Sequence, residues 1–221
     1  GTLYGVCRFL EEYVGVRWYA PGVEHTPTTQ TLNIPPIDRT VQPAFEYRLT
    51  SYEWPGGDEE FFKHQLGNAG NNLEDATYGV EQAVDGRAHS YFWYVSPEEF
   101  FDEHPEYFSE IGGVRIKDET QLCLTNPDVL DIVTERMLQR MADKPHVRQH
   151  NFSQKDRYNY CQCDECTAMN EKYKTAGGTQ FWFVNELAKR TSQVYPDKVI
   201  GTLAYMYTEA PPAGLALHPT A

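Results

Sequence analysis

Residues 150–171 read HNFSQKDRYNYCQCDECTAMNE and bring two kinds of chemistry together. The first seven residues predict the end of a strand that opens into a polar loop carrying one carboxylate, Asp156. Cys161, Cys163 and Cys166 follow in C-x-C-x2-C spacing, directly before a segment expected to be helical. Three thiols so close together bind a metal ion or form disulfides. In both cases they hold the loop that presents Asp156.

Strands and helices alternate on both sides of this stretch. This alternation predicts a parallel sheet with βα crossovers. Because no glycine-rich dinucleotide fingerprint is present, five such units favour part of a (βα)8 TIM-like barrel over a nucleotide-binding fold. A local hairpin of 114–116 with 121–124 is expected between them. Strands are expected at 45–50, 71–75, 89–95, 147–153 and 199–207, and helices at 58–67, 97–108, 127–141 and 181–194.

The expected fold class is therefore α/β, with three segments along the chain. Residues 1–22 are expected to be the C-terminal end of a small α/β domain, with a helix over 2–13 and a strand over 16–19. Residues 23–43 are rich in Thr and Pro and are interpreted as a linker. Residues 44–221 are then the N-terminal part of a truncated barrel, because a complete barrel takes about 250 residues.

The composition argues against several classes of partner. The formal charge is −13 and the Lys and Arg residues do not cluster, so neither nucleic acid nor an anionic membrane surface is expected. No apolar run approaches the roughly 18 residues of a transmembrane helix, so no membrane span is expected. Aromatic residues make up 14 % of the chain. Flat rings stack on sugar faces, although core packing accounts for most of them.

Several blocks of the sequence together resemble a known family. They are GTLYGVCRFLEEYVGVRWYAPG (1–22), FFDEHPEYFSEIGG (100–113), QLCLTNPDV (121–129), SQKD (153–156) with CQCDEC (161–166), and TLAYMYTEAPP (202–212). The chain resembles a bacterial family of mostly secreted proteins, domain of unknown function family 4838, which is similar to family 67 α-glucuronidases and to β-hexosaminidases. The resemblance implies a small α/β domain before a (βα)8 barrel that acts on carbohydrate. It also implies a secreted or periplasmic protein whose signal peptide is not in this chain. Cys7 departs from the pattern, because an aromatic residue is expected there.

Asp156 is the candidate catalytic residue. Function in a barrel sits at the carboxyl ends of the strands, and Asp156 follows the fourth expected strand, where the related glycosidases carry acidic residues. Hydrolysis generally uses two carboxyl groups. The second is expected from Glu53, from Glu209 or from strands beyond this chain, unless the substrate's own acetamido group is the nucleophile. The structural alternative for Asp156 is a helix cap, or a bond to Tyr or Arg in its own loop.

Five residues are candidates for binding substrate. Arg48 on the first strand has the geometry to fork onto a sugar carboxylate, and a structural ion pair is the alternative. His89 begins the third expected strand and Trp93 lies towards its end. Tyr205 lies near the end of the fifth strand, and Gln154 completes the set. Core packing is the alternative for the aromatic rings.

Cys123 joins Cys161, Cys163 and Cys166 as a fourth candidate metal ligand. Four thiolates are enough for a closed, tetrahedral, structural zinc site, which has no open position for water and no catalytic role. Two disulfides are the alternative for a secreted protein. Metal is favoured because three closely spaced thiols are difficult to pair without strain. Cys7 is the cysteine left over.

Two functions from different classes follow. The first is a glycoside hydrolase that acts on uronide or hexosaminide-like glycans, with Asp156 as acid or substrate anchor. The alternative is a non-catalytic, carbohydrate-binding barrel in a polysaccharide-utilisation system. A third hypothesis is an interaction module held together by zinc, with no sugar site.

Overall fold

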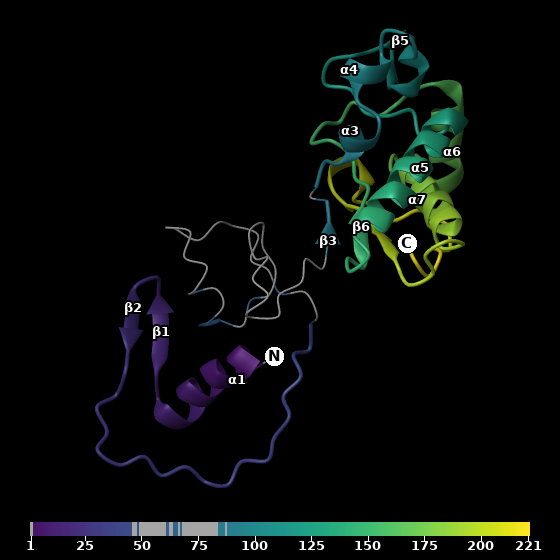
Figure 1. Ribbon diagram of the computed structural model, residues 1–221. Helices are drawn as coiled ribbons and strands as arrows, with labels where there is room; N and C mark the ends of the chain where they lie inside the picture. Colours follow the sequence, from purple (N-terminus) through teal and green to yellow (C-terminus); the bar gives the residue numbers. More distant parts are fainter. Residues whose placement is uncertain are drawn as a thin grey trace. The chain divides into compact units, whose positions relative to one another are not determined.

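The computed structural model describes residues 2–45, 48, 61, 64, 65, 67, 84–86 and 88–221. They belong to two compact units, Gly1–Ala83 and Val84–Ala221 (Figure 1). The strand expected at 71–75, most of the strand at 45–50 and most of the helix at 58–67 lie outside the described residues.

The first unit begins with a helix that widens along its length. α1 (Thr2–Phe9) continues as a π-helical turn, η1 (Leu10–Val14), and the helix ends at Gly15 with a left-handed φ of 88°. β1 (Arg17–Ala20) then pairs antiparallel with β2 (Val23–His25). The helix and the first strand lie where the sequence predicts them, whereas β2 falls at the start of the stretch interpreted as a linker.

The second unit is built on a parallel sheet of three strands. β3 (Val84–Asp85), β6 (Gln149–Asn151) and β7 (Val199–Gly201) are hydrogen-bonded in the order β3-β6-β7. β6 and β7 lie inside the strands predicted at 147–153 and 199–207, and both pairings in the sheet are parallel. The described part of the chain is therefore α/β with a parallel sheet, as the alternating pattern predicts.

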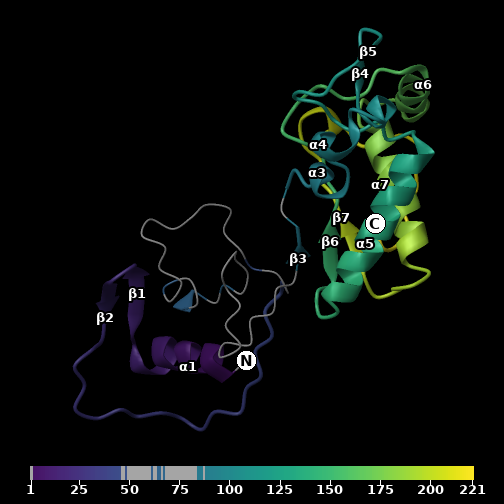
Figure 2. The same cartoon turned by 45° about the horizontal axis from the view of Figure 1, so that its top comes forward.

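Two helices cover one face of this sheet. α5 (Pro127–Asp143) and α7 (Gly178–Thr191) pack against each other on the same side of β6 (Figures 1 and 2). Asp85, His150 and Ile200 are neighbours across the strands and point to this face, where all three are buried. The sheet therefore buries a charged residue and a histidine next to an aliphatic one.

The opposite face of the sheet carries an amide pair. Gln149 Nε2 donates to Asn151 Oδ1 at 2.9 Å, and Asn151 Nδ2 donates to the Gly86 carbonyl at 2.8 Å. A β-carbon at Gly201 would collide with both side-chain amides. Glycine at this position is what allows the pair to lie flat across β6 and β7.

The helix ends have local causes in the sequence. Asn126 Oδ1 accepts hydrogen bonds from the backbone N–H groups of Asp128 (2.8 Å) and Val129 (3.3 Å), and Pro127 occupies the first turn of α5. This arrangement is a side-chain cap followed by proline, the pair that favours a helix start. α6 (Asp164–Tyr173) ends at Lys174, which adopts a left-handed φ of 56°. None of the helices in the described part is long and apolar enough to cross a bilayer.

The core of the second unit is aromatic around the end of β6. The Phe152 ring stacks on Tyr91 and Phe183, with centroids 4.6 and 4.9 Å apart, and meets Tyr94 edge-on at 5.6 Å. All four rings are fully buried. Phe152 is the first residue after β6, so this packing fixes the direction in which the chain leaves the strand towards Asp156.

The strand predicted at 89–95 is wrong. Residues Tyr91–Tyr94 form a helical turn, α3, and the strand that pairs with β6 is the earlier β3. Tyr91 and Tyr94 are three positions apart and both are fully buried, whereas Trp93 between them is 47 % exposed. This is helical spacing, and a short aromatic run does not distinguish it from a strand. A second short helix, α4 (Pro97–Phe100), and a 3-10 turn, η3 (Pro105–Tyr107), replace the single helix expected at 97–108.

The predicted hairpin has a different partner. β5 (Val114–Arg115) pairs with β4 (Glu110–Ile111) and not with 121–124. Gly112 and Gly113 form the turn between them with φ values of 58° and 82°. Two successive positive φ angles are what a tight two-residue hairpin turn requires. Leu122 instead forms an isolated antiparallel bridge with Phe108. Backbone hydrogen bonds from Ser109 to Gln121 and from Cys123 to Tyr107 flank this bridge, so the segment around Cys123 pairs with 107–109.

Candidate functional site

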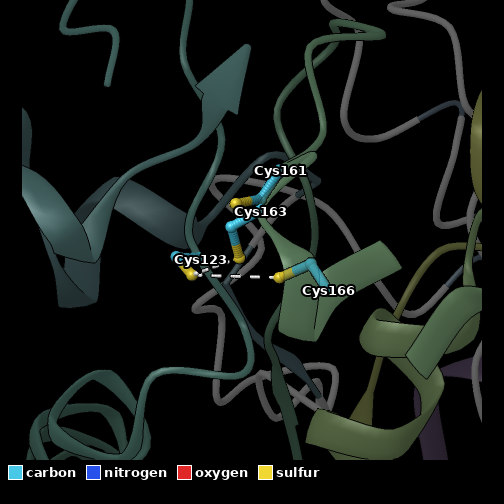
Figure 3. A group of neighbouring side chains, drawn as sticks. All are labelled: Cys123, Cys161, Cys163 and Cys166. Carbon is cyan, nitrogen blue, oxygen red and sulfur yellow. Dashed lines mark hydrogen bonds between the residues drawn. The ribbon is translucent and has the colours of Figure 1, made fainter. Parts of the chain in front are cut away.

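Four cysteines from two distant segments meet in the second unit. Cys123 lies in the segment after β5, where its N–H donates to the Tyr107 carbonyl at 2.8 Å. Cys161 and Cys163 lie in the loop that follows β6, and Cys166 lies in the first turn of α6. Figure 3 shows the sulfur atoms of these two segments pointing towards one another. All four side chains are buried.

The spacing of the sulfur atoms suits a metal ion. Cys123 Sγ lies 3.7 Å from Cys163 Sγ and 3.8 Å from Cys166 Sγ, and all four sulfurs lie within 4.8 Å of one another. Metal–sulfur bonds of about 2.3 Å in a tetrahedral site place the sulfurs about 3.8 Å apart. The thiols are free, and these separations are far longer than the roughly 2.0 Å of a disulfide bond. The cluster could therefore hold a metal ion.

Donors surround the cluster. The Glu110 N–H donates to Cys161 Sγ at 3.4 Å, and Arg115 Nη1 donates to the same sulfur at 3.5 Å. The Thr125 hydroxyl lies 3.1 Å from Cys166 Sγ. These groups stabilise negative charge on sulfur, and Arg115 brings a full positive charge to the cluster.

Three of the thiols also shift one another's pKa. Hydrogen bonds from Cys161 and Cys166 hold the pKa of Cys123 far below its usual range. The same interactions raise the pKa of Cys161 to about 12 and raise that of Cys166 as well. Four thiols this close cannot all ionise without a cation between them, because like charges repel strongly at such distances.

The loop that carries Asp156 is held by Gln121, two positions before Cys123. Gln121 is 1 % exposed. Its Nε2 donates to the carbonyls of Lys155 (2.9 Å) and Arg157 (2.8 Å), and its Oε1 accepts from the Lys155 N–H at 2.9 Å. Gln121 is not among the site residues predicted from the sequence, although it belongs to the QLCLTNP block.

Four of the predicted site residues come together at the carboxyl ends of the strands. His89 Nδ1 lies 2.8 Å from the Gln154 carbonyl, and the His89 and Tyr205 rings are 6.4 Å apart. Gln154 is fully buried, and its Nε2 donates to the Tyr205 carbonyl (3.0 Å) and to Thr208 Oγ1 (2.8 Å). The exposed Asp156 raises the pKa of Tyr205 through a hydrogen bond and its negative charge. The last strand is predicted to run to residue 207, but β7 ends at Gly201, and a 3-10 turn, η4 (Met206–Thr208), directly follows Tyr205.

The other predicted residues belong to other segments of the chain. Trp93 is on α3 and not on a strand, and its ring lies beneath the Arg140 guanidinium at 5.3 Å. Arg48 belongs to the first unit, where its Nη1 donates to the Phe45 carbonyl at 2.7 Å. Glu209 is exposed just after η4, and Glu53 lies outside the described residues.

A second group of ionisable residues surrounds Asp85. Its carboxylate accepts two hydrogen bonds from Arg140 (2.7 and 2.8 Å) and one from Lys144 (2.6 Å). It also lies 3.3 Å from His150 Nδ1. Burial alone would raise the pKa of Asp85, but the bonds from His150, Arg140 and Lys144 outweigh burial and hold it far below its usual range. No motif in the sequence indicated this group.

The fold and the site define a class of protein: an α/β chain with a parallel sheet and a buried four-cysteine cluster to which the loop after β6 contributes. The family model described as "Domain of unknown function (DUF4838)" matches residues 18–220, and the chain belongs to this family. Comparison with curated proteins and with solved structures gives no match.

Proposed function

We propose that this protein acts on carbohydrate as a glycoside hydrolase, with Asp156 as the acid or the substrate anchor. The observation that carries the proposal is the convergence of His89, Gln154, Asp156 and Tyr205. They come from three segments, which follow β3, β6 and β7. Ligands of parallel α/β sheets bind at the carboxyl ends of the strands. The resemblance to glycosidases points to uronides or hexosaminides as substrates, and to a secreted or periplasmic location.

The local chemistry suits a sugar. Asp156 is exposed, so its carboxylate is accessible to a ligand hydroxyl or glycosidic oxygen. Tyr205 is 46 % exposed and offers a ring face on which a pyranose can stack. His89 is held with a positive φ of 64° by bonds from its N–H to Ser153 Oγ (2.9 Å) and from Lys155 Nζ to its carbonyl (3.4 Å). Such backbone strain persists where surrounding contacts impose it, and it is frequent at functional sites.

We further propose that the four-cysteine cluster binds Zn²⁺ as a structural ion. The support is the donor set: four buried sulfurs lie within 4.8 Å of one another, two of their separations match those of a tetrahedral site, and zinc favours closed four-thiolate sites. Four thiolates leave no position for water or substrate, so the ion would take no part in hydrolysis. In an oxidising compartment, metal binding also keeps such thiols from pairing as disulfides.

The test of the sugar site is the exchange Asp156→Asn, assayed against a panel of aryl uronides and aryl hexosaminides. If Asp156 is the acid, turnover falls by about 10²–10⁴-fold, the usual contribution of general acid catalysis. Asp118→Asn is the matched control, because Asp118 is also an exposed loop aspartate. Hydrolysis that survives Asp156→Asn at the wild-type rate and affinity would rule out both roles for this carboxylate.

The second candidate function is non-catalytic carbohydrate binding. One observation favours it: the four converging residues include a single carboxylate, Asp156, whereas hydrolysis generally uses two. Calorimetric titration with oligosaccharides separates the two functions. Binding without release of reducing sugar, lost in Asp156→Asn and kept in Asp118→Asn, would identify a binding protein.

A further inference from the structure

We propose that Gln121 is a positioning residue for Asp156, and that metal bound at the four cysteines keeps Gln121 in place. The significance of Asp156 rests on the function proposed above, but the contacts themselves do not. The placement of the loop would then depend on a metal ion that never touches the substrate.

The Gln121 side-chain amide holds the backbone on both sides of Asp156. Its three hydrogen bonds reach the backbone of Lys155 and Arg157, the residues immediately before and after Asp156. A buried amide that bonds the chain on both sides of one residue fixes the backbone from which the side chain between them projects. Asp156 itself stays exposed, so the amide positions the backbone of Asp156 without covering its carboxylate.

Gln121 and Asp156 each lie in a segment that also carries a proposed metal ligand. Cys123 lies two residues after Gln121 in the same segment, and Cys161 lies five residues after Asp156 in the same loop. A metal ion shared by Cys123 and Cys161 therefore ties the two segments together at one point, and the Gln121 amide ties them at another. Two attachments between the same two segments prevent either from sliding past the other.

A third contact extends the arrangement to Tyr205. The Tyr160 ring, beside Cys161, packs on the Tyr207 ring at 4.9 Å. Tyr207 is buried in η4, two residues after Tyr205. The end of the loop that the cysteines hold thus also contacts the turn that positions the Tyr205 ring. Both partners of the Asp156–Tyr205 pair are supported from the cysteine side.

The experiment is hydrogen–deuterium exchange on the full chain loaded with zinc, comparing wild type with Gln121→Met. Methionine keeps the length of the side chain and removes its donors and acceptor. We expect exchange of peptides covering 155–160 to rise at least tenfold, with zinc content unchanged and α7 still protected. Gln162→Met is the matched control, because Gln162 is an exposed glutamine between two of the cysteines, and it should leave 155–160 unchanged.

A second measurement tests the role of the metal. Because it uses the wild type, it remains informative even if Gln121→Met does not fold. Chelation of zinc from the wild type should raise exchange over 155–160 while α7 stays protected. Unchanged exchange at 155–160 in the chelated protein, with a rise confined to 161–166, would overturn the proposal. Neither measurement uses a sugar. A wild type that neither binds nor cleaves glycans therefore refutes the proposed function, while exchange still decides the role of Gln121.

Discussion

The second unit contains two buried groups of ionisable side chains, and they differ in how their charge is balanced. Around Asp85, one carboxylate is matched by Arg140 on α5 and by Lys144 directly after α5, and it also lies 3.3 Å from His150 on β6. Around Cys123, four thiols lie close together, and the cation in contact with them among the described residues is Arg115. A buried charge without a partner is strongly unfavourable. The first group is balanced by its own side chains, whereas the four thiols of the second would need a cation from outside the chain in order to ionise together.

The largest effect should come from the unbalanced group. Apparent zinc-binding free energies of structural sites are about 10–16 kcal/mol, and part of this free energy stabilises the fold. We expect Cys123→Ser to lose stoichiometric zinc and to lower the free energy of unfolding more than any other change considered below. Metal analysis, the visible spectrum of the cobalt-substituted protein and urea unfolding measure this. Cys7→Ser is the control, because Cys7 is also buried but lies outside the cluster. If the two variants have equal zinc content and equal stability, the cluster is not a metal site.

The next effect belongs to the balanced group. Asp85→Asn leaves Arg140 and Lys144 without their anion, and breaking a buried ion pair costs about 3–5 kcal/mol. We expect the lower end, about 3 kcal/mol, because Arg140 and Lys144 are 30 % and 35 % exposed and water screens them. Asp131→Asn is the control: Asp131 pairs with Arg190 at 2.5 Å but is 67 % exposed, so its loss should cost below about 1 kcal/mol. Urea unfolding compares the two, and equal losses would show that burial is not decisive.

Asp85→Asn and Asp131→Asn should also differ in how their free energy of unfolding changes with pH. Because the pKa of Asp85 is depressed in the folded protein, the unfolded chain binds a proton at higher pH than the folded one. The stabilising contribution is therefore complete above the ordinary Asp pKa of about 3.9. It is lost as pH falls from there through the depressed value. Unfolding measured between about pH 5 and pH 2 should depend less on pH in Asp85→Asn than in wild type or Asp131→Asn.

The smallest effect concerns the one cation of the thiol cluster. Arg115→Met removes the guanidinium beside Cys161, and losing a group that supports a ligand lowers metal affinity by about 10–100-fold. Arg115→Lys keeps the charge and should retain part of the affinity. Competition with a colorimetric chelator measures this difference. Wild-type affinity in Arg115→Met would mean that the backbone and hydroxyl donors suffice.

The sequence predicts those parts of this architecture that have local causes. Asn126-Pro127 marks the start of α5, and the structure confirms that helix. β6 (QHN) and β7 (VIG) lie inside strands that the sequence predicts, although only β7 is itself apolar. The cysteines are predictable as a group because three thiols so close in sequence must also lie close together in space, whichever segment supplies the fourth.

Contacts between distant segments account for what the sequence does not predict. Tyr91, Trp93 and Tyr94 read as a strand because alternation and helical spacing coincide over so few residues. Asp85 and Gln121 carry no motif; their partners Arg140 and Lys155 lie 55 and 34 positions away. A single sequence shows the residue types at such positions but not which of them meet.

The position of Cys123 also has a consequence for the order of folding. It lies 40 residues before Cys163, and all of α5 and β6 lies between them. The three downstream thiols can gather around an ion as soon as their loop exists, because the chain that joins them is short. The fourth ligand arrives only after α5 and β6 have packed, since closing that long ring costs chain entropy that their packing must offset. If the cluster binds zinc as proposed, a metal held by three thiols would precede the four-thiol site during folding, and completion of the coordination would report that the sheet and α5 have assembled.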